Sequence, residues 1–158
     1  MKKSFTHLDA NGQPTMVDVS DKPVTVREAI AQTTVVLPQE ILNLWDAEDI
    51  KTKKGPVFQT SILAGIMAVK KTSQLIPLCH PLPILKSNVD ISINKDREVE
   101  INCVVKTEGK TGVEMEALTG ATVAALTIYD MCKGFSQNII IKETRLIKKR
   151  GGKSDYNG

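Results

Sequence analysis

The residues best suited to chemistry lie on a long stretch of helical pattern in the second half of the chain. Glu114 and Glu116 stand at its start, and Asp130 and Lys133 stand near its end. Positions three apart share a helix face, so Asp130 and Lys133 form a potential acid–base pair. The two glutamates also fit an ordinary solvated helix start, because acidic first turns match the helix dipole. The spacing alone leaves a functional and a structural interpretation open.

Glu116 and Asp130 are fourteen residues apart. At about 100° per residue, this spacing places them on nearly the same helix face. At about 1.5 Å per residue, they are still roughly 21 Å apart along the helix. If both residues serve one site, we predict that two subunits form it, a hypothesis that a fully active monomer would exclude.

Prolines stiffen residues 75–85, which are predicted to cross the surface as an extended connection because proline ends helices and cannot pair in a central strand. This segment contains Cys79 and His80. A rigid backbone suits the presentation of an imidazole to a ligand, although a purely structural histidine fits the same position. Adjacent residues rarely bind one ion with good geometry, and no second ligand pair has zinc spacing. The sequence therefore predicts no zinc site.

Lys54 stands in a basic loop directly before Gly55 and Pro56, where a helix is predicted to begin. An ammonium group beside the free amides of a helix N-terminus can hold phosphate. A solvated, lysine-rich loop is the equally open alternative. The basic run 148–154 is a weaker hint, since it lacks the leading glycine of a Walker motif and no helix follows it. Phosphate is the ligand class that these hints share.

The elements that position these residues follow from the hydrophobic pattern. The chain has 158 residues and 41% hydrophobic content, which predicts a single core. Residues 24–37 mix helix and strand signals, and we interpret them as strand. The predicted order is strand, helix, helix, strand, strand, helix, strand, at residues 24–37, 38–45, 58–69, 89–93, 99–105, 113–133 and 139–147. This order predicts an α+β fold, a ferredoxin-like antiparallel sheet with helices packed on one face.

The rest of the chain is predicted to be less ordered. Residues 1–20 have little apolar periodicity and are interpreted as a mobile N-terminal arm. Residues 21–150 form the single ferredoxin-like domain, and residues 151–158 form a flexible, basic, glycine-containing tail. No apolar run resembles a signal peptide or reaches transmembrane length, so we expect no membrane association.

Composition narrows the expected partners and compartment. A net charge of +3 is well short of the single-sign surface of a typical nucleic-acid binder, so no nucleic-acid partner is predicted. The three cysteines are far apart, and an odd count argues against a disulfide framework. We therefore expect a cytoplasmic protein.

Three motifs stand out together, LIPLCHPL at residues 75–82, KTGVEMEALTG at 110–120 and ALTIYDMCK at 125–133. In this order they resemble the cyclic pyranopterin monophosphate synthase family, also called molybdenum cofactor biosynthesis protein C. The similarity extends over nearly the whole chain and includes MVDVS at 16–20 and GGKS near the end. Three long motifs in one order are a specific signal.

The resemblance implies that residues 21–150 are a catalytic domain. It implies a lyase that rearranges 3',8-cyclo-7,8-dihydro-GTP to cyclic pyranopterin monophosphate with release of pyrophosphate. It also implies a homohexamer, a trimer of dimers with active sites at subunit interfaces. The alternative is a non-catalytic nucleotide- or RNA-binding module of the same topology. The predicted hairpin strands and final strand contain no aromatic residue for stacking bases, which disfavours that alternative.

Carried over by position, the resemblance implies catalytic roles for Asp130, as acid or base, and for Lys133 and Lys54. The positions that match substrate contacts are Leu78, Cys79, His80, Met115 and Glu116, with Glu114 and Lys149 as weaker matches. Lys54, Lys149 and Lys153 are our candidates for holding the departing pyrophosphate.

No metal site of the protein itself is predicted. Mg²⁺ on the triphosphate is compatible with the resemblance, with Glu114 and Glu116 as candidate holders. Arg150 stands where the tail of the family usually has serine, and Asp155 replaces a following glycine. These two departures leave the phosphate contacts of the tail open.

Overall fold

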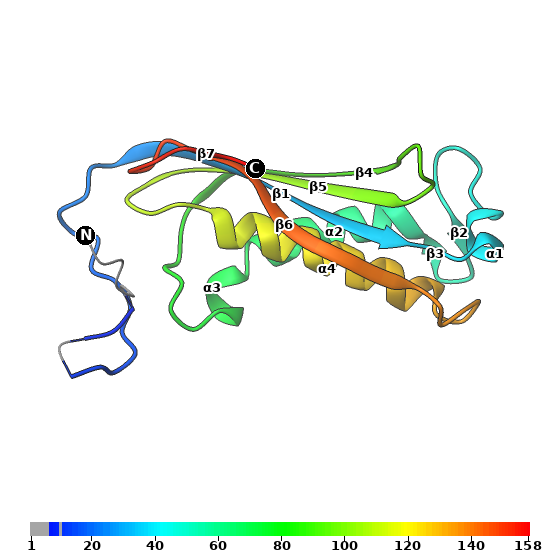
Figure 1. Ribbon diagram of the computed structural model, residues 1–158, viewed down its shortest axis with the longest axis horizontal. Helices are drawn as coiled ribbons and strands as arrows, with labels where there is room; N and C mark the ends of the chain where they lie inside the picture. Colours follow the sequence, from blue (N-terminus) through cyan, green and yellow to red (C-terminus); the bar gives the residue numbers. More distant parts are fainter. Residues whose placement is uncertain (1–6, 10) are drawn as a thin grey trace.

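A five-stranded antiparallel sheet with helices on one face forms the body of the protein (Figure 1). The computed structural model describes residues 7–9 and 11–158, so the part of the predicted arm at 1–6 and 10 lies outside the described residues. The strand order is β4-β5-β1-β6-β7. The strands are β1 (Thr25–Val36), β4 (Ile84–Ile93), β5 (Val99–Gly109), β6 (Ile140–Arg150) and β7 (Tyr156–Asn157). The first strand lies between β5 and β6, which confirms the predicted ferredoxin-like topology.

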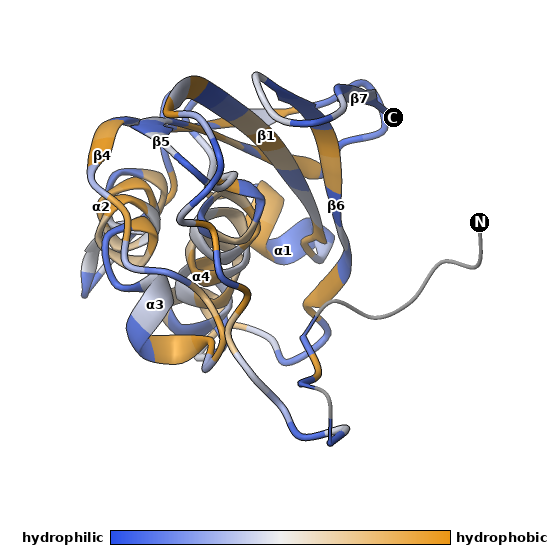
Figure 2. Ribbon diagram, turned by 90° about the vertical axis from the view of Figure 1, so that its left-hand side faces the viewer, coloured by the Kyte–Doolittle hydropathy of each residue, from blue (hydrophilic) through white to orange (hydrophobic). Residues whose placement is uncertain are grey.

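Helices α2 and α4 lie side by side against one face of the sheet (Figure 2). The helices are α1 (Gln39–Leu42), α2 (Val57–Val69), α3 (Thr72–Leu75) and α4 (Glu114–Cys132). A small antiparallel hairpin, β2 (Lys51–Thr52) and β3 (Gly55–Pro56), precedes α2. Among the described residues, none of the helices is long and apolar enough to cross a bilayer.

Small residues let α4 approach both the sheet and α2 closely. A Cβ atom added at Gly120 of α4 would lie 2.6 Å from Sγ of Cys103 in β5, and one added at Gly65 of α2 would lie 2.8 Å from the carbonyl oxygen of Gly120. Alternating strand residues such as Ala31 and Val105 are fully buried beneath the helices. This tight packing determines where the two ends of α4 lie.

Several predicted boundaries are wrong by a few residues. The helix predicted at 38–45 ends at Leu42, because Trp45 instead bridges Ile50 and the chain turns. Strand β4 begins at Ile84, five residues before the predicted start. Strand β6 continues to Arg150, since its basic end pairs with β1 and β7, and that end has no hydrophobic alternation to reveal it.

Candidate active site

Lys54, Asp130 and Lys133 form a cluster, called here the lysine–aspartate cluster. The Nζ atom of Lys133 lies 2.7 Å from Oδ1 of Asp130, and Nζ of Lys54 lies 3.0 Å from Oδ2. Both ammonium groups therefore donate to the same carboxylate. All three side chains are a little more than half exposed, so a substrate can reach them.

Two separate segments bring these charges together. Asp130 is in the last turn of α4 and Lys133 is its C-terminal cap residue, so the helix itself sets their spacing. Lys54 lies in the turn of the β2–β3 hairpin, where its backbone N–H donates to the hydroxyl of Thr52 at 3.1 Å. Gly55 closes the turn with φ = 113°, a conformation that side chains other than hydrogen disfavour.

The cluster is charged in its resting state. Hydrogen bonds from Lys133 and then Lys54 lower the pKa of Asp130, so this carboxyl is ionised at neutral pH. Asp130 in turn raises the pKa of Lys133 and keeps it an ammonium. The cluster therefore combines one proton acceptor with two cations.

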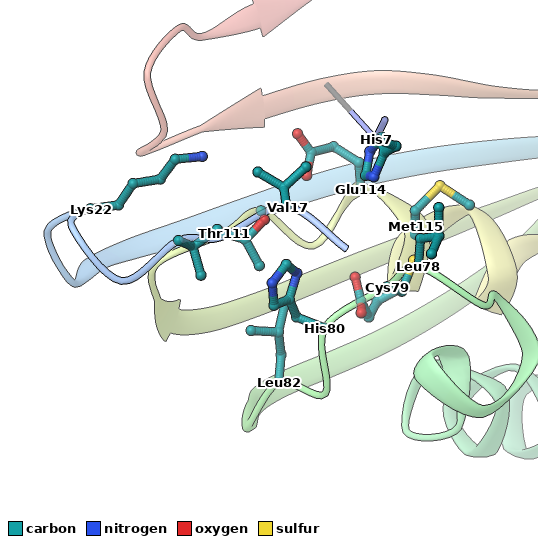
Figure 3. A pocket seen from close by; sticks show the side chains of 13 residues that line it. His7, Val17, Lys22, Leu78, Cys79, His80, Leu82, Thr111, Glu114 and Met115 are labelled. Atoms are coloured by element: carbon teal, nitrogen blue, oxygen red, sulfur yellow. The ribbon is translucent and has the colours of Figure 1, made fainter. Parts of the chain in front are cut away.

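A second group of predicted residues lines a cleft of about 380 Å³, called here the main cleft, at the start of α4. Figure 3 shows the side chains of Leu78, Cys79 and His80 gathered around it with Glu114 and Met115. They come from the proline-stiffened connection and from the first turn of α4. The volume is in the range that holds small ligands.

Glu116 lines the same cleft and has only 4% of its surface exposed. Burial raises the pKa of its carboxyl, and the neighbouring Glu114 carboxylate adds to the shift. Burial also raises the pKa of the Cys79 thiol, with a further contribution from Glu116. The Cys79 side chain therefore lines the cleft as a neutral thiol rather than as a thiolate nucleophile.

A smaller basic cleft adjoins the main cleft on the other side of Glu114. Lys149 of β6 pairs with Glu114, with 3.0 Å between Nζ and Oε1. The predicted residue Lys153 lines this basic cleft as well. Lys22 and Arg27 add two cations that were not predicted from the sequence. The nearby MVDVS motif at 16–20 is the only signal for Lys22, and Arg27 has no such signal.

The start of α2 does not provide the free amides that the phosphate interpretation of the Lys54 loop required. The amides at the start of α2, beside Lys54, are not free for a ligand, because Val57 N–H donates to the carbonyl of Ile50 at 2.9 Å. The N–H groups of Phe58 and Gln59 donate to the carboxylate of Asp49. The Lys54 ammonium group pairs with Asp130 instead. The sequence around Lys54 could not show that the Asp49 side chain caps α2.

The two groups of site residues lie at opposite ends of α4 (Figure 1). The cleft residues surround its start, and the lysine–aspartate cluster surrounds its end. Because α4 is one continuous helix of 19 residues, the separation of roughly 21 Å between Glu116 and Asp130 holds within one chain.

The sequence pattern that defines the MoaC family matches residues 16–152, nearly the whole chain. The chain belongs to the MoaC family. The match covers both ends of α4, the proline-stiffened connection and the Lys54 hairpin. It therefore includes every predicted site residue except Lys153.

The names of three similar proteins refer to a pterin synthase or to molybdenum cofactor biosynthesis. The chain is 51% identical, over 96% of its length, to the "Cyclic pyranopterin monophosphate synthase" of Xanthomonas axonopodis pv. citri, and covers 92% of that protein. It is 56% identical to the "Molybdenum cofactor biosynthesis bifunctional protein" of Synechocystis sp. and 51% identical to "Molybdenum cofactor biosynthesis protein 1" of Dictyostelium discoideum. It spans only 45% and 26% of these two proteins.

The carboxylates suggested as holders of Mg²⁺ do not form an open metal site. Glu114 is engaged by Lys149, and Glu116 is buried with a raised pKa. Residues 7–9 and 11–158 contain no group of three or more His, Cys, Asp or Glu side chains placed to hold an ion. Since Mg²⁺ needs several ordered oxygen ligands, these side chains alone do not fit it.

Proposed function

We propose that this MoaC family member is a cyclic pyranopterin monophosphate synthase of molybdenum cofactor biosynthesis, acting in the cytoplasm. It converts 3',8-cyclo-7,8-dihydro-GTP to cyclic pyranopterin monophosphate and releases pyrophosphate. The observation that carries this proposal is the lysine–aspartate cluster, in which two ammonium groups hold one ionised carboxylate. Such a cluster provides both the proton transfers and the cations that this reaction requires.

Ring opening of the purine-derived part and closure of the pterin need repeated proton transfers near neutral pH. Asp130 is ionised there and acts as the proton acceptor. Lys133 acts as a proton donor, because the carboxylate beside it stabilises its charged form rather than its free amine. A substrate phosphate that draws Lys54 away would raise the pKa of Asp130 toward its ordinary value and make it a stronger base.

Closing the cyclic phosphate requires a sugar hydroxyl to attack the innermost phosphorus while pyrophosphate departs. Negative charge then grows on the leaving group, and fixed cations stabilise it. The basic cleft offers these cations through Lys22, Arg27, Lys149 and Lys153. Val113, the N-cap residue of α4, makes no side-chain cap and lines the same basic cleft, so the positive end of the helix dipole adds to these cations.

We propose that a second copy of the chain completes each site. Packing two α4 helices antiparallel, with the two-fold axis near Val123, would bring Asp130 beside the partner subunit's Glu116. The exposed apolar side chains of Met115 and Leu126, at 38% and 53%, support this arrangement because a second helix would bury them. The hexamer expected for this family would contain three such pairs.

The test is pyrophosphate release from 3',8-cyclo-7,8-dihydro-GTP by the purified protein, compared with Lys133→Ala and Asp130→Ala. We expect release by the wild type and loss of at least about 100-fold in either variant. Binding of the substrate by the wild type without release of pyrophosphate would instead favour the non-catalytic nucleotide-binding module.

A further inference from the structure

Asp49 is a buried carboxylate outside both groups of site residues. It lies between α1 and β2, and only 6% of its surface is exposed. Its Oδ1 atom accepts hydrogen bonds from the N–H groups of Ile50 and Phe58, at 2.6 and 2.7 Å, and Oδ2 accepts one from Gln59 at 3.0 Å. A buried charge is tolerated only when it is hydrogen-bonded in this way.

The hydrogen bonds of Asp49 replace a missing local cap. Helix α2 begins after Pro56, whose side chain has no oxygen to accept the free N–H groups of the first helical turn. Asp49, seven residues before Pro56 in the chain, accepts two of these N–H groups, those of Phe58 and Gln59. It therefore joins the segment before the β2–β3 hairpin to the helix after it.

This junction forms the base of the hairpin that carries Lys54. Asp49 comes just before the hairpin, and its hydrogen bonds from Phe58 and Gln59 tie it to the residues that come just after the hairpin. The adjacent hydrogen bond, from Val57 N–H to the carbonyl of Ile50, joins the same two segments. Lys54 lies at the tip of this loop.

Asp49 also acts electrostatically on the end of α4. Burial raises the pKa of the Cys132 thiol to about 11, and the Asp49 carboxylate adds a smaller electrostatic contribution to the shift. Cys132 lies between Asp130 and Lys133 in the chain. Asp49 is thus bound directly to the start of α2, the helix that packs along α4.

We propose that Asp49 is a positioning residue for the lysine–aspartate cluster, which it serves by fastening the Lys54 hairpin so that the Lys54 ammonium meets Asp130. The consequence for turnover rests on the function proposed above. The consequence for geometry does not, and the two are tested separately.

The geometric test follows the Lys54 side chain by NMR in protein labelled with ¹³C,¹⁵N-lysine, with its signal assigned from Lys54→Arg. In the wild type, we expect the Lys54 signal to shift when Asp130 is changed to Asn. In protein carrying Asp49→Asn, which keeps the size but loses one acceptor oxygen and the charge, we expect less than about a third of that shift. A shift of full size in the Asp49→Asn background would overturn the proposal.

The kinetic test uses pyrophosphate release. We expect Asp49→Asn to lower kcat by roughly 10- to 100-fold, the effect of a catalytic group displaced by about 1 Å, while KM changes less than about threefold. If Asp49→Asn instead raised KM by a similar factor and left kcat unchanged, this result would contradict a positioning role. The matched control is Asp96→Asn, the same chemical change in the exposed turn between β4 and β5, for which kcat should be unchanged.

A further variant separates positioning from helix capping. Pro56→Asp, added to Asp49→Asn, puts a cap at the N-cap position itself, where it can accept the N–H groups of Phe58 or Gln59. We expect this change to raise the melting temperature without restoring kcat, and recovery of kcat would overturn the proposal. If Asp49→Asn weakens the NMR coupling as expected but the wild-type protein releases no pyrophosphate, the proposed function fails while the role of Asp49 stands.

Discussion

Lys54 and Asp130 are 76 positions apart in the chain, and the Lys54 ammonium group donates two hydrogen bonds to Asp130. The Nζ atom of Lys54 donates to Oδ2 of Asp130 at 3.0 Å and to its backbone carbonyl at 3.1 Å. Carbonyl groups in the last turn of a helix have no helical partner and attract cations. Lys54 is therefore a C-terminal cap of α4 as well as a member of the lysine–aspartate cluster.

Replacing Lys54 tests how much the cluster depends on this cation. We expect Lys54→Met to lower turnover at least about 100-fold, because the ammonium group that would bind the substrate phosphate beside Asp130 is lost. The unfolding midpoint in urea should change little, since exposed ion pairs contribute little to stability. Lys142→Met is the matched control, because the Lys142 side chain is as exposed as that of Lys54 and pairs with Glu98 outside the site. A Lys54→Met protein as active as the control would remove Lys54 from the mechanism.

Sharing of sites between subunits can be tested by mixing inactive variants. Asp130→Asn removes the cluster, and His80→Ala alters the cleft at the other end of α4. Co-expressed with two different tags and purified through both, hexamers in which the two variants combine at random should regain about one quarter of wild-type turnover. Each variant co-expressed with itself is the control. Mixed protein no more active than its parents would show that each chain contains a whole site.

Glu116 should make stability depend on pH. Its folded-state pKa is raised by burial, so its neutral form is favoured in the folded protein. The contribution of Glu116 to the free energy of unfolding is fully present below the ordinary pKa of a glutamate, and it is lost as pH rises through the raised pKa. We therefore expect Glu116→Gln to have a higher melting temperature than the wild type at pH 7, and a much smaller difference at pH 4. Equal differences at both pH values would mean that Glu116 is not buried as a neutral acid.

Gly112 should control the pair between Glu114 and Lys149. A Cβ atom at Gly112 would overlap Oε2 of Glu114, so Gly112→Ala must push this carboxylate away from Lys149. We expect kcat/KM to fall about 10-fold, the equivalent of one hydrogen bond to a charged group, with little change in stability because the Glu114 side chain is flexible. Gly134→Ala is the control, since a Cβ atom there meets nothing within 4 Å. Equal activities for both alanine variants would contradict a role for this pair.

Local patterns predicted most of the fold. The helical spacing of α2 and α4 and the alternation in β5 appear directly in the sequence, because burial repeats every 3.6 residues in a helix and every two in a strand. The topology followed from the order of these elements. Boundaries were less accurate where charged residues continued a strand, as at Lys148 and Lys149 in β6.

The sequence by itself determined which side chains share a local segment, such as Asp130 with Lys133 on one helix turn and Cys79 with His80 in one stiff connection. Only the tertiary structure decided that Lys54 reaches Asp130 and that Asp49 caps α2 in place of a phosphate. Contacts within one turn follow from backbone geometry, which is the same in every helix. Contacts between distant segments depend on how the loops close and how the core packs, and no local pattern encodes that choice.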